Sequence, residues 1–402
     1  MSEGTLTGIY CLVLTEFKNR AEIAVLCRKV KPDSYQPLSF KCTLFVRSFN
    51  YLPVVMQEAI VNPMNSEWQN FLTASGAVSA QNGQPGFESD VSEQVQDTVC
   101  DLSADVVLRI TGDDAEKFLQ GQFSNDIAAL TDGTSQLSTW SSPKGRVITV
   151  FRIVRLAENH YLMQLPRELV AAVHKRLKMF VLMAKVIIEL EENLICIGLS
   201  GNAVVTALET SLGPPPPELD GSAVHGEVVI SRVRGAYPRF EVIAPVTDAI
   251  DLWSDMAGVA RQSGQSVWRW QNIEAAVPSI GSETTEAFVL QMLNLQHING
   301  VNFKKGCFPG QEVVARMQYL GKLKRRMYRA SVSAESMLQA GDEIYNEGVS
   351  SSVGKVVDAT GNGSGQMHLL AVLAIAAADK PLFADKEATC AIELLDLPYV
   401  LE

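Results

Sequence analysis

Apolar and polar residues alternate, or recur with helical spacing, from about residue 100 to the C-terminus. Residues 106–110 alternate as a strand does, and Asp113 is placed to cap a short helix that follows. Residues 146–156 and 160–165 are expected to pair as strands about a short turn. The helix predicted after these strands carries apolar residues on one face, namely Leu169, Val173, Leu177 and Phe180.

The patterns after residue 189 predict two further units. Between 189 and 271 the order is strand, helix, two strands, helix and strand, which is typical of a ferredoxin-like unit, and the last strand is expected at 266–270. Residues 323–402 contain short strand-like segments separated by Gly and Ser, which predicts a small β-barrel. The glycine cluster at 361–365 predicts a hairpin turn, because no helix pattern follows it. The fold class is therefore α+β.

Composition changes sharply near the N-terminus. Residues 1–63 contain seven Lys or Arg, whereas residues 64–108 contain none. The first segment shows little sustained helical or strand period, so its contribution to a core is doubtful. We therefore treat residues 1–63 as an N-terminal extension of uncertain status.

Charge and cysteine usage restrict the classes of protein. With 34 Lys+Arg and 45 Asp+Glu the net charge is −11, which argues against general adhesion to nucleic acid or anionic lipid. The longest uninterrupted apolar stretch, 369–378, is about half of the ~20 residues that cross a bilayer, so no membrane association is expected. Seven cysteines without a Cys-x-x-Cys pair indicate a reducing, cytoplasmic location and no local metal motif.

The densest group of reactive residues surrounds Cys307, in a loop that precedes a predicted helix. Pro309 fits the first turn of that helix. Lys304 and Lys305 lie beside the cysteine and favour the thiolate over the thiol, which could act as a nucleophile, a redox group or a soft ligand. The alternative is that Cys307 is a small buried hydrophobe. No neighbouring His or Asp supplies a base, so a Cys-His pair is not predicted.

Residues 304–329 form a basic segment. It contains eight Lys or Arg and one acid, a net charge of +7 in a chain whose net charge is −11. Such a segment can hold a polyanion, either RNA phosphates or the glutamate tail of a folate. It can equally be a solvated face.

Residues 268–274 bring aromatic rings and a carboxylate together. A flat heteroaromatic ring can stack on the indole of Trp268, and the carboxylate of Glu274 can accept the ring N–H and the amino group of a pterin together. The alternative is that Trp268 and Trp270 are core residues on opposite faces of a strand, with Glu274 solvated.

From about Met64 to its end the chain resembles the YgfZ folate-binding, tRNA-modifying proteins, which are relatives of the T-protein (aminomethyltransferase) of the glycine-cleavage system. The most specific motif is Lys305-Gly306-Cys307 followed by Gly310-Gln311-Glu312-Val313-Val314-Ala315-Arg316. Weaker motifs follow one another in the family's order: Ile110-Thr111-Gly112, Phe118-Leu119-Gln120-Gly121-Gln122, Pro143-Lys144-Gly145, Asn272-Ile273-Glu274-Ala275 and Leu397-Pro398-Tyr399.

The resemblance implies a three-domain, T-protein-like ring with folate bound toward a central channel. It implies a discontinuous folate-binding domain of residues 97–188 and 272–322. A ferredoxin-like domain of residues 189–271 and a C-terminal β-barrel of residues 323–402 would complete the ring.

The resemblance also implies roles for individual residues. Trp268 would contact the folate, and Cys307 with Lys305 would belong to the family's signature loop. Phe308 stands where the family has a tyrosine, and a second folate-contacting tryptophan is replaced near Asp105. The catalytic aspartate of the T-protein has no counterpart in residues 146–149, so direct aminomethyl transfer is not expected.

The leading hypothesis is a tetrahydrofolate-binding accessory protein without turnover of its own. By the family resemblance it would support iron–sulfur enzymes or their assembly factors, including those that methylthiolate tRNA, and its link to tRNA would be indirect. Cys307 would be the reactive or transiently ligating thiol, Lys305 would favour its anion, and Trp268 with Glu274 would hold tetrahydrofolate or another reduced folate. Two rival hypotheses are a folate-dependent one-carbon transferase and a protein that binds tRNA directly through residues 304–329.

Overall fold

A computed structural model describes residues 11–17, 20–26, 64–79, 85–87, 96–319, 321–349, 351–361 and 365–401. The chain divides into two compact units, Met1–Ala59 and Ile60–Glu402. In the first unit, β1 (Cys11–Phe17) and β2 (Arg20–Leu26) pair antiparallel. The remaining part of residues 1–63, whose status the sequence left uncertain, lies outside the described residues.

The first large sheet of the second unit has five antiparallel strands. Its order is β10-β6-β9-β8-β7. The strands are β6 (Asp105–Thr111), β7 (Thr134–Ser141), β8 (Val147–Ala157), β9 (His160–Pro166) and β10 (Ile187–Glu191). The associated helices are α2 (Ala115–Gln120), the short 3-10 helix η2 (Ile127–Ala129) and α3 (Arg167–Val181). The strands and helices predicted for this region are present.

Two details of these helices differ from the prediction. The residue that precedes α2 is Asp114, not Asp113, and its side chain accepts a hydrogen bond from the backbone of Lys185 instead of capping the helix. In α3, Leu169, Val173 and Leu177 are buried, but Phe180, in the last turn, is 45% exposed and meets the core through an edge-to-face contact with Trp140.

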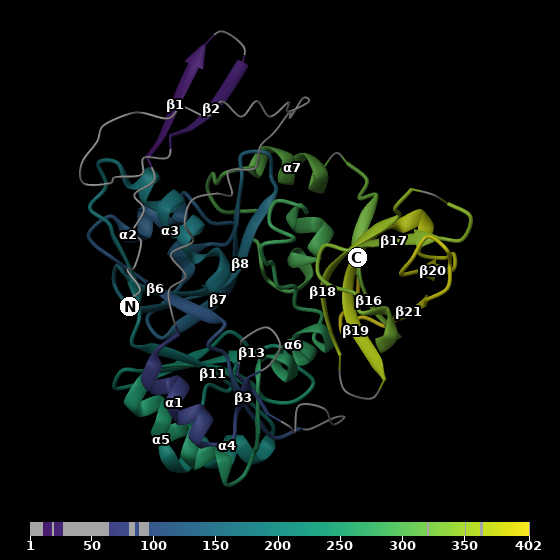
Figure 1. The fold of residues 1–402 in the computed structure, drawn as a ribbon. Helices are drawn as coiled ribbons and strands as arrows, with labels where there is room; N and C mark the ends of the chain where they lie inside the picture. Colours follow the sequence, from purple (N-terminus) through teal and green to yellow (C-terminus); the bar gives the residue numbers. More distant parts are fainter. Residues whose placement is uncertain are drawn as a thin grey trace, which may run out of the picture. The chain divides into compact units, whose positions relative to one another are not determined.

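The second sheet has six strands in the order β12-β13-β14-β11-β5-β15. They are β5 (Thr98–Asp101), β11 (Leu194–Ser200), β12 (Ser222–His225), β13 (Val228–Val233), β14 (Arg239–Pro245) and β15 (Arg261–Ser263). Helices α4 (Asn202–Ser211) and α5 (Val246–Ala257) connect its strands, and α1 (Ser66–Ala74) packs beside α5 through Trp68 and Trp253. Figure 1 shows these three helices together on one side of the sheet. The short strands β3 (Val78–Ser79) and β4 (Pro85–Gly86) pair with each other.

This sheet corrects one strand of the predicted ferredoxin-like pattern. Residues 266–270 belong to the helix α6 (Gln265–Glu274), which buries Val267, Trp268 and Gln271 at helical spacing. Over so short a stretch the apolar pattern around Trp268 fits a strand as well as a helix, so the predicted strand at 266–270 is wrong. The last strand is β15, and it pairs in parallel with β5, which is inserted between β15 and β11. The predicted domain ranges assign Thr98–Asp101, which forms β5, to the folate-binding domain. The pairing of β5 with β11 and β15 places it in this second sheet instead.

The C-terminal region forms the predicted closed barrel, with strand order β16-β19-β18-β17-β20-β21. The strands are β16 (Arg325–Ser333), β17 (Glu343–Asn346), β18 (Gly354–Gly361), β19 (Gln366–Ala374), β20 (Leu382–Phe383) and β21 (Ala391–Leu395). Two 3-10 helices, η5 (Ala334–Ser336) and η6 (Ile375–Ala377), lie between strands. Antiparallel pairing of β18 with β19 continues to Gly361 and Met367, and residues 362–364 of the predicted hairpin turn lie outside the described residues.

The segment between α6 and the barrel contains η3 (Leu290–Leu293), η4 (Leu295–His297) and α7 (Gln311–Tyr319). It shares a hydrophobic core with β8 and the barrel. A separate core joins the two large sheets, with Val107 and Val154 from the first and Cys196 and Ile243 from the second. The α+β fold class and the C-terminal barrel are therefore confirmed. None of the helices in the described ranges is long and apolar enough to span a membrane.

Candidate functional site

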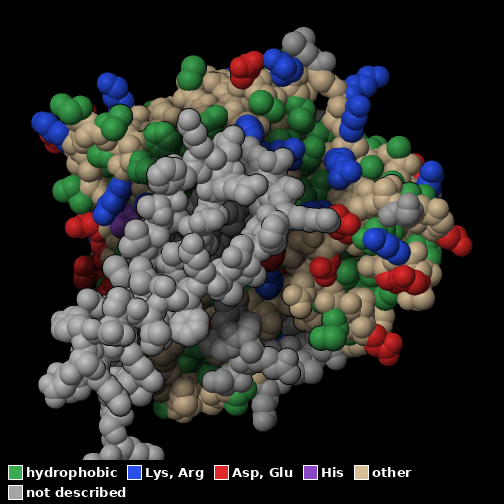
Figure 2. Space-filling view, turned by 45° about the horizontal axis from the view of Figure 1, so that its top comes forward, with side chains coloured by type: hydrophobic (Ala, Val, Ile, Leu, Met, Phe, Trp, Pro, Cys, Tyr) green, Lys and Arg blue, Asp and Glu red, His purple; other side chains and the backbone are tan. Residues whose placement is uncertain are grey.

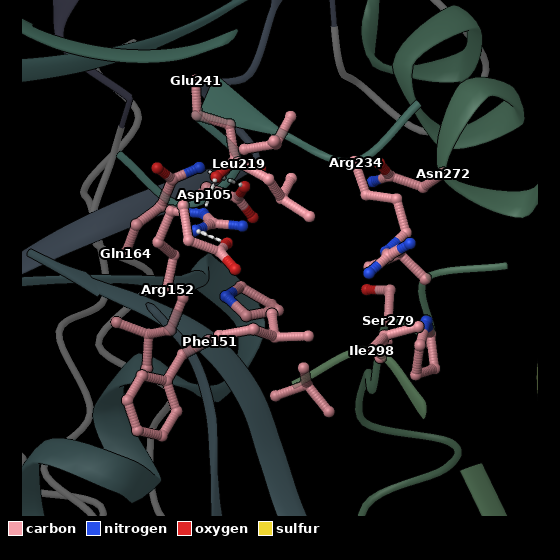
Figure 3. Close-up of a pocket in the computed structure, with 18 residues that line it drawn as sticks. Asp105, Phe151, Arg152, Gln164, Leu219, Arg234, Glu241, Asn272, Ser279 and Ile298 are labelled. Atoms are coloured by element: carbon pink, nitrogen blue, oxygen red, sulfur yellow. Dashed lines mark hydrogen bonds and ion pairs between the residues drawn. The ribbon is translucent and has the colours of Figure 1, made fainter. Parts of the chain in front are cut away.

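A cavity of about 90 Å³ opens between the two large sheets (Figure 3). Its polar wall comes from strands β6, β8, β9 and β14, and its other side comes from the segment after β13 and from residues 272–279. Phe151, Leu137 and Ile298 are among the apolar residues that line it. The cavity therefore presents both polar groups and apolar surface to a ligand.

Arg152 fixes two of the cavity's carboxylates. Its guanidinium pairs with Asp220 at 2.9 Å and with Glu241 at 2.9 Å, and its side chain is only 9% exposed. Burial lowers the pKa of Arg152, but the charges of Glu241 and Asp220 outweigh this effect, so that the pKa lies above its ordinary value. The three side chains form a closed charge network that holds this wall rigid.

Asp105 is the third carboxylate of the cavity. It begins β6, and its Oδ2 accepts a hydrogen bond of 3.0 Å from Nε2 of Gln164 on β9. Burial raises the pKa of Asp105 to about 7. An acid that titrates near neutral pH can change its charge when a ligand arrives.

Arg234 lies across the cavity from Asp105, as Figure 3 shows. In the described parts of the chain its guanidinium has no ion pair, although its backbone carbonyl accepts a bond from Arg239. Asn272 on α6 lines the same side, and its Oδ1 accepts a hydrogen bond of 2.9 Å from Arg239. Arg234 is thus a cation available to an anionic ligand.

Trp268 lies in the core, beside the cavity but not in its lining. The indole is 1% exposed. One side packs on Gly198, where an added Cβ would meet the ring at 2.5 Å, and the Arg239 guanidinium lies 3.9 Å from the ring centroid. A pterin could stack on this ring only if Arg239 left it, so the predicted stacking role stays a prediction.

Both carboxylate oxygens of Glu274 contact residues of the barrel. Oε2 pairs with Arg329 at 2.9 Å, and Oε1 lies 3.0 Å from Nδ1 of His368. Burial raises the pKa of Glu274, but the hydrogen bond with His368 and the charge of Arg329 together bring it below its ordinary value. Glu274 therefore joins α6 to the barrel, and its predicted role as a pterin ligand would compete with these two partners.

Cys307 is exposed, in the loop that leads into α7. The other cysteines whose side chains the structure describes are less accessible: Cys100 and Cys196 are buried, and Cys390 is partly buried. The helix begins at Gln311, so Pro309 precedes its first turn instead of lying in it. The exposure of Cys307 removes the alternative that it is a buried hydrophobe and leaves its sulfur open to reagents.

Lys305 holds the Cys307 loop in place. Its Nζ donates hydrogen bonds to three backbone carbonyls, those of Gln120 at 2.6 Å, Phe123 at 2.6 Å and Asn125 at 3.0 Å. The residue is 7% exposed, and this burial lowers the pKa of Lys305 to about 8. The ammonium group thus has a full set of backbone acceptors, and it positions the loop.

Two glycines allow the loop to approach the Pro143-Lys144-Gly145 turn. Gly310 has φ +82°, and a Cβ there would lie 2.6 Å from both the Gly145 Cα and the Ser142 carbonyl oxygen. Gly145 has φ +71°, and a Cβ there would lie 3.0 Å from Val313. Two motifs far apart in sequence therefore form one contact, which explains why both require glycine.

The structure separates the cations of the basic segment 304–329 into those that are buried or ion-paired and those that are exposed. Lys305 is buried, Arg329 pairs with Glu274, and Arg316 pairs with Glu312. The members that are exposed and have no ion pair within the described ranges are Lys304, Lys322, Lys324 and Arg325. Figure 2 shows several Lys and Arg side chains close together on one side of the drawn face. The charge available to a polyanion is smaller than the sequence count suggests.

Sequence reasoning missed most of the cavity. It named Asn272 within a motif and Asp105 as a replaced position, but not Arg152, Gln164 or Arg234. These side chains come from strands distant in sequence, and only the sheet register brings them together. Across the described ranges no group of three or more His, Cys, Asp or Glu residues is placed to hold a metal ion.

Comparison with known proteins gives three consistent similarities. Residues 88–212 match the family described as the GCVT N-terminal domain. The tRNA-modifying protein YgfZ of Colwellia psychrerythraea is 32% identical over 247 residues, which cover 61% of this chain and 75% of that protein. The glycine cleavage system aminomethyltransferase T from Bartonella henselae has a similar structure, with a TM-score of 0.65 and 16% identity over 83% of this chain and 97% of that chain. At such low identity the last similarity shows a shared fold alone.

Proposed function

The chain belongs to the YgfZ family, and from that premise we propose that it binds a reduced folate in the cavity between its two large sheets and supports tRNA modification. The name of its YgfZ relative supplies the tRNA-modification context, and the T-protein-like fold supplies the expectation of a folate. The proposal also includes support for iron–sulfur enzymes, a reactive Cys307 and a cytoplasmic location.

The composition of the cavity carries the folate part of the proposal. A folate has a flat ring with a polar edge, an apolar middle and a carboxylate tail. Asp105 can accept N–H groups, Phe151 and Ile298 offer apolar surface, and Arg234 can receive a carboxylate. Asn272 belongs to the same helix as Trp268 and Glu274, so the segment that the sequence selected contributes to the cavity through a different residue.

A folate titration followed by tryptophan fluorescence tests this function. Trp268 lies close to the cavity, so binding of tetrahydrofolate should change the emission and saturate. Arg234→Ala removes a charge-assisted contact with the tail, worth about 1.5–3 kcal/mol, and should weaken binding at least tenfold. Lys117→Ala, an exposed cation of α2, is the matched control and should bind like the wild type. Absence of saturable binding would rule out the proposed function.

Cys307 is the proposed thiol of this function. Its support is its exposure and a loop that Lys305 and Gly310 hold in one position. In a strain that lacks the protein, Cys307→Ala should fail to restore tRNA thiolation, whereas Cys390→Ala, from the barrel, should restore it. Full restoration by Cys307→Ala would remove the thiol from the proposal.

One observation keeps the one-carbon transferase as a second candidate. Residues 146–149 lack an aspartate, but Asp105 is a carboxyl whose pKa of about 7 would suit a base. The transferase predicts turnover of a methylamine donor by the purified protein with tetrahydrofolate, and the leading proposal predicts binding without turnover.

The exposed cations Lys304, Lys322, Lys324 and Arg325 keep direct tRNA binding as a further candidate. It predicts tRNA affinity that falls steeply with salt, by about one unit of log–log slope for each phosphate contacted. A salt-independent or undetectable interaction would exclude it.

A further inference from the structure

The three carboxylates of the cavity differ in their partners. Asp220 and Glu241 both pair with Arg152, which compensates their charge. Within the described residues, the side chain of Asp105 has only the neutral amide of Gln164 as a hydrogen-bond partner, and that bond uses Oδ2. Asp105 is therefore the one of these three carboxylates without an ion pair among the described residues, and none of those residues donates a hydrogen bond to its Oδ1.

Gln164 holds Asp105 in place from the neighbouring strand. The glutamine is 4% exposed, and its Oε1 has no hydrogen-bond partner. The hydrogen bond from its Nε2 to Oδ2 of Asp105 therefore fixes the orientation of the carboxylate.

The charged groups around Asp105 come from several elements. Burial is the largest influence on its pKa and raises it; Glu241 on β14 and Asp101 on β5 also raise it, while Gln164 and Arg167 on α3 lower it. The buried thiol of Cys196 on β11 also interacts electrostatically with Asp105. Together these groups bring the pKa of Asp105 to about 7, so that the free protein holds a proton there over much of the neutral range.

We propose that Asp105 is a ligand-contacting carboxylate that accepts the adjacent N–H groups of a folate's amino-pyrimidine edge, and that folate binding releases its proton. This inference rests on the proposed folate function and deepens it. The two N–H donors stabilise the ionised carboxylate, and the proton passes to solvent. Folate binding and loss of this proton are then linked, so affinity rises with pH until Asp105 is ionised in the free protein.

Isothermal titration with 5-formyltetrahydrofolate tests the linkage in the full-length protein. Titrations at pH 6 and pH 8, each in two buffers of different ionisation enthalpy, give both the affinity and the number of protons released. We expect binding about tenfold tighter at pH 8 than at pH 6, with about one proton released at pH 6 and almost none at pH 8. These wild-type measurements need no variant.

Two variants identify the source of the proton. Asp105→Asn keeps an acceptor for Gln164 but cannot ionise, so its affinity should be weak and should change less than about twofold between pH 6 and pH 8. Asp255→Asn, which removes an exposed carboxylate of α5, should behave like the wild type.

The outcomes separate this inference from the function on which it rests. Saturable folate binding with equal affinity at both pH values and no proton release would overturn the role of Asp105 and leave the proposed function intact. Proton release that persists in Asp105→Asn would also overturn it. Absence of binding at either pH would overturn both.

Discussion

Replacing Lys305 by methionine should destabilise the protein by about 3 kcal/mol at pH 7. Methionine has a similar length but donates no hydrogen bond, so the carbonyls of Gln120, Phe123 and Asn125 would lose their donor. Each buried carbonyl left without a partner costs about 1 kcal/mol or more. This loss of stability is expected because Lys305 joins its own loop to residues 120–125. A lysine whose main task were to activate the exposed thiol would contribute far less stability.

Urea unfolding of the wild type, Lys305→Met and Lys304→Met measures this difference. Lys304 is exposed, so its replacement should change the free energy of unfolding by less than about 0.5 kcal/mol. If Lys305→Met is as stable as Lys304→Met, the three hydrogen bonds of Lys305 do not stabilise the fold as proposed.

The pH dependence of the stability difference between the wild type and Lys305→Met tests the burial of Lys305 independently. Burial lowers the pKa of Lys305 to about 8 from 10.5, so the folded protein loses this proton before the unfolded chain does. Between these values the unfolded state holds more protons, and the wild type should gain up to about 1.4 kcal/mol of stability per pH unit relative to Lys305→Met. A difference that shrinks as pH rises through this window would contradict the assignment.

The same geometry gives three further predictions. Gly310→Ala should lower the free energy of unfolding by about 2 kcal/mol in a urea titration, because its φ of +82° and its contact with the 143–145 turn leave no room for a Cβ. Gly198→Ala should red-shift the emission of Trp268, since a Cβ would lie 2.5 Å from the indole and push it out of its packing; unchanged emission would contradict that contact. The pKa of Asp105 is raised to about 7 from 3.8, so the wild type loses stability as pH rises through this range. Asp105→Asn should therefore be more stable than the wild type by about 2 kcal/mol at pH 8 and equally stable near pH 4. The value of about 2 kcal/mol is half of the free energy that corresponds to the full pKa shift, because the residue is partly exposed. Thermal melts at both pH values check this.

Local patterns in the sequence were sufficient for most elements of the fold. The strands β6, β8 and β9 and the helix α3 follow from alternation, helical period and proline, because each is long enough for its period to be read. The stretch 266–270 was too short for this, and its helix depends on burial against β5 and β11. The insertion of β5 between β11 and β15 is a long-range pairing that no local pattern contains.

The candidate site was predictable only where one segment contains it. The Cys307 loop was identified from its sequence, and the structure exposes that cysteine. The three carbonyl acceptors of Lys305 were not predicted, because they lie about 180 residues earlier in the chain. Trp268 and Glu274 were chosen for their chemistry, but Arg239 and Arg329, which engage them, come from the distant strands β14 and β16.

The proposed function places a reduced folate in the cavity between the two large sheets. Hydrogen–deuterium exchange with and without saturating 5-formyltetrahydrofolate tests the location directly. We expect slower exchange in peptides that contain residues 219–220 and 277–279, which line the cavity, and no change in barrel strands β17 and β20. Saturable binding with protection confined to the barrel, or to any surface away from these residues, would contradict it.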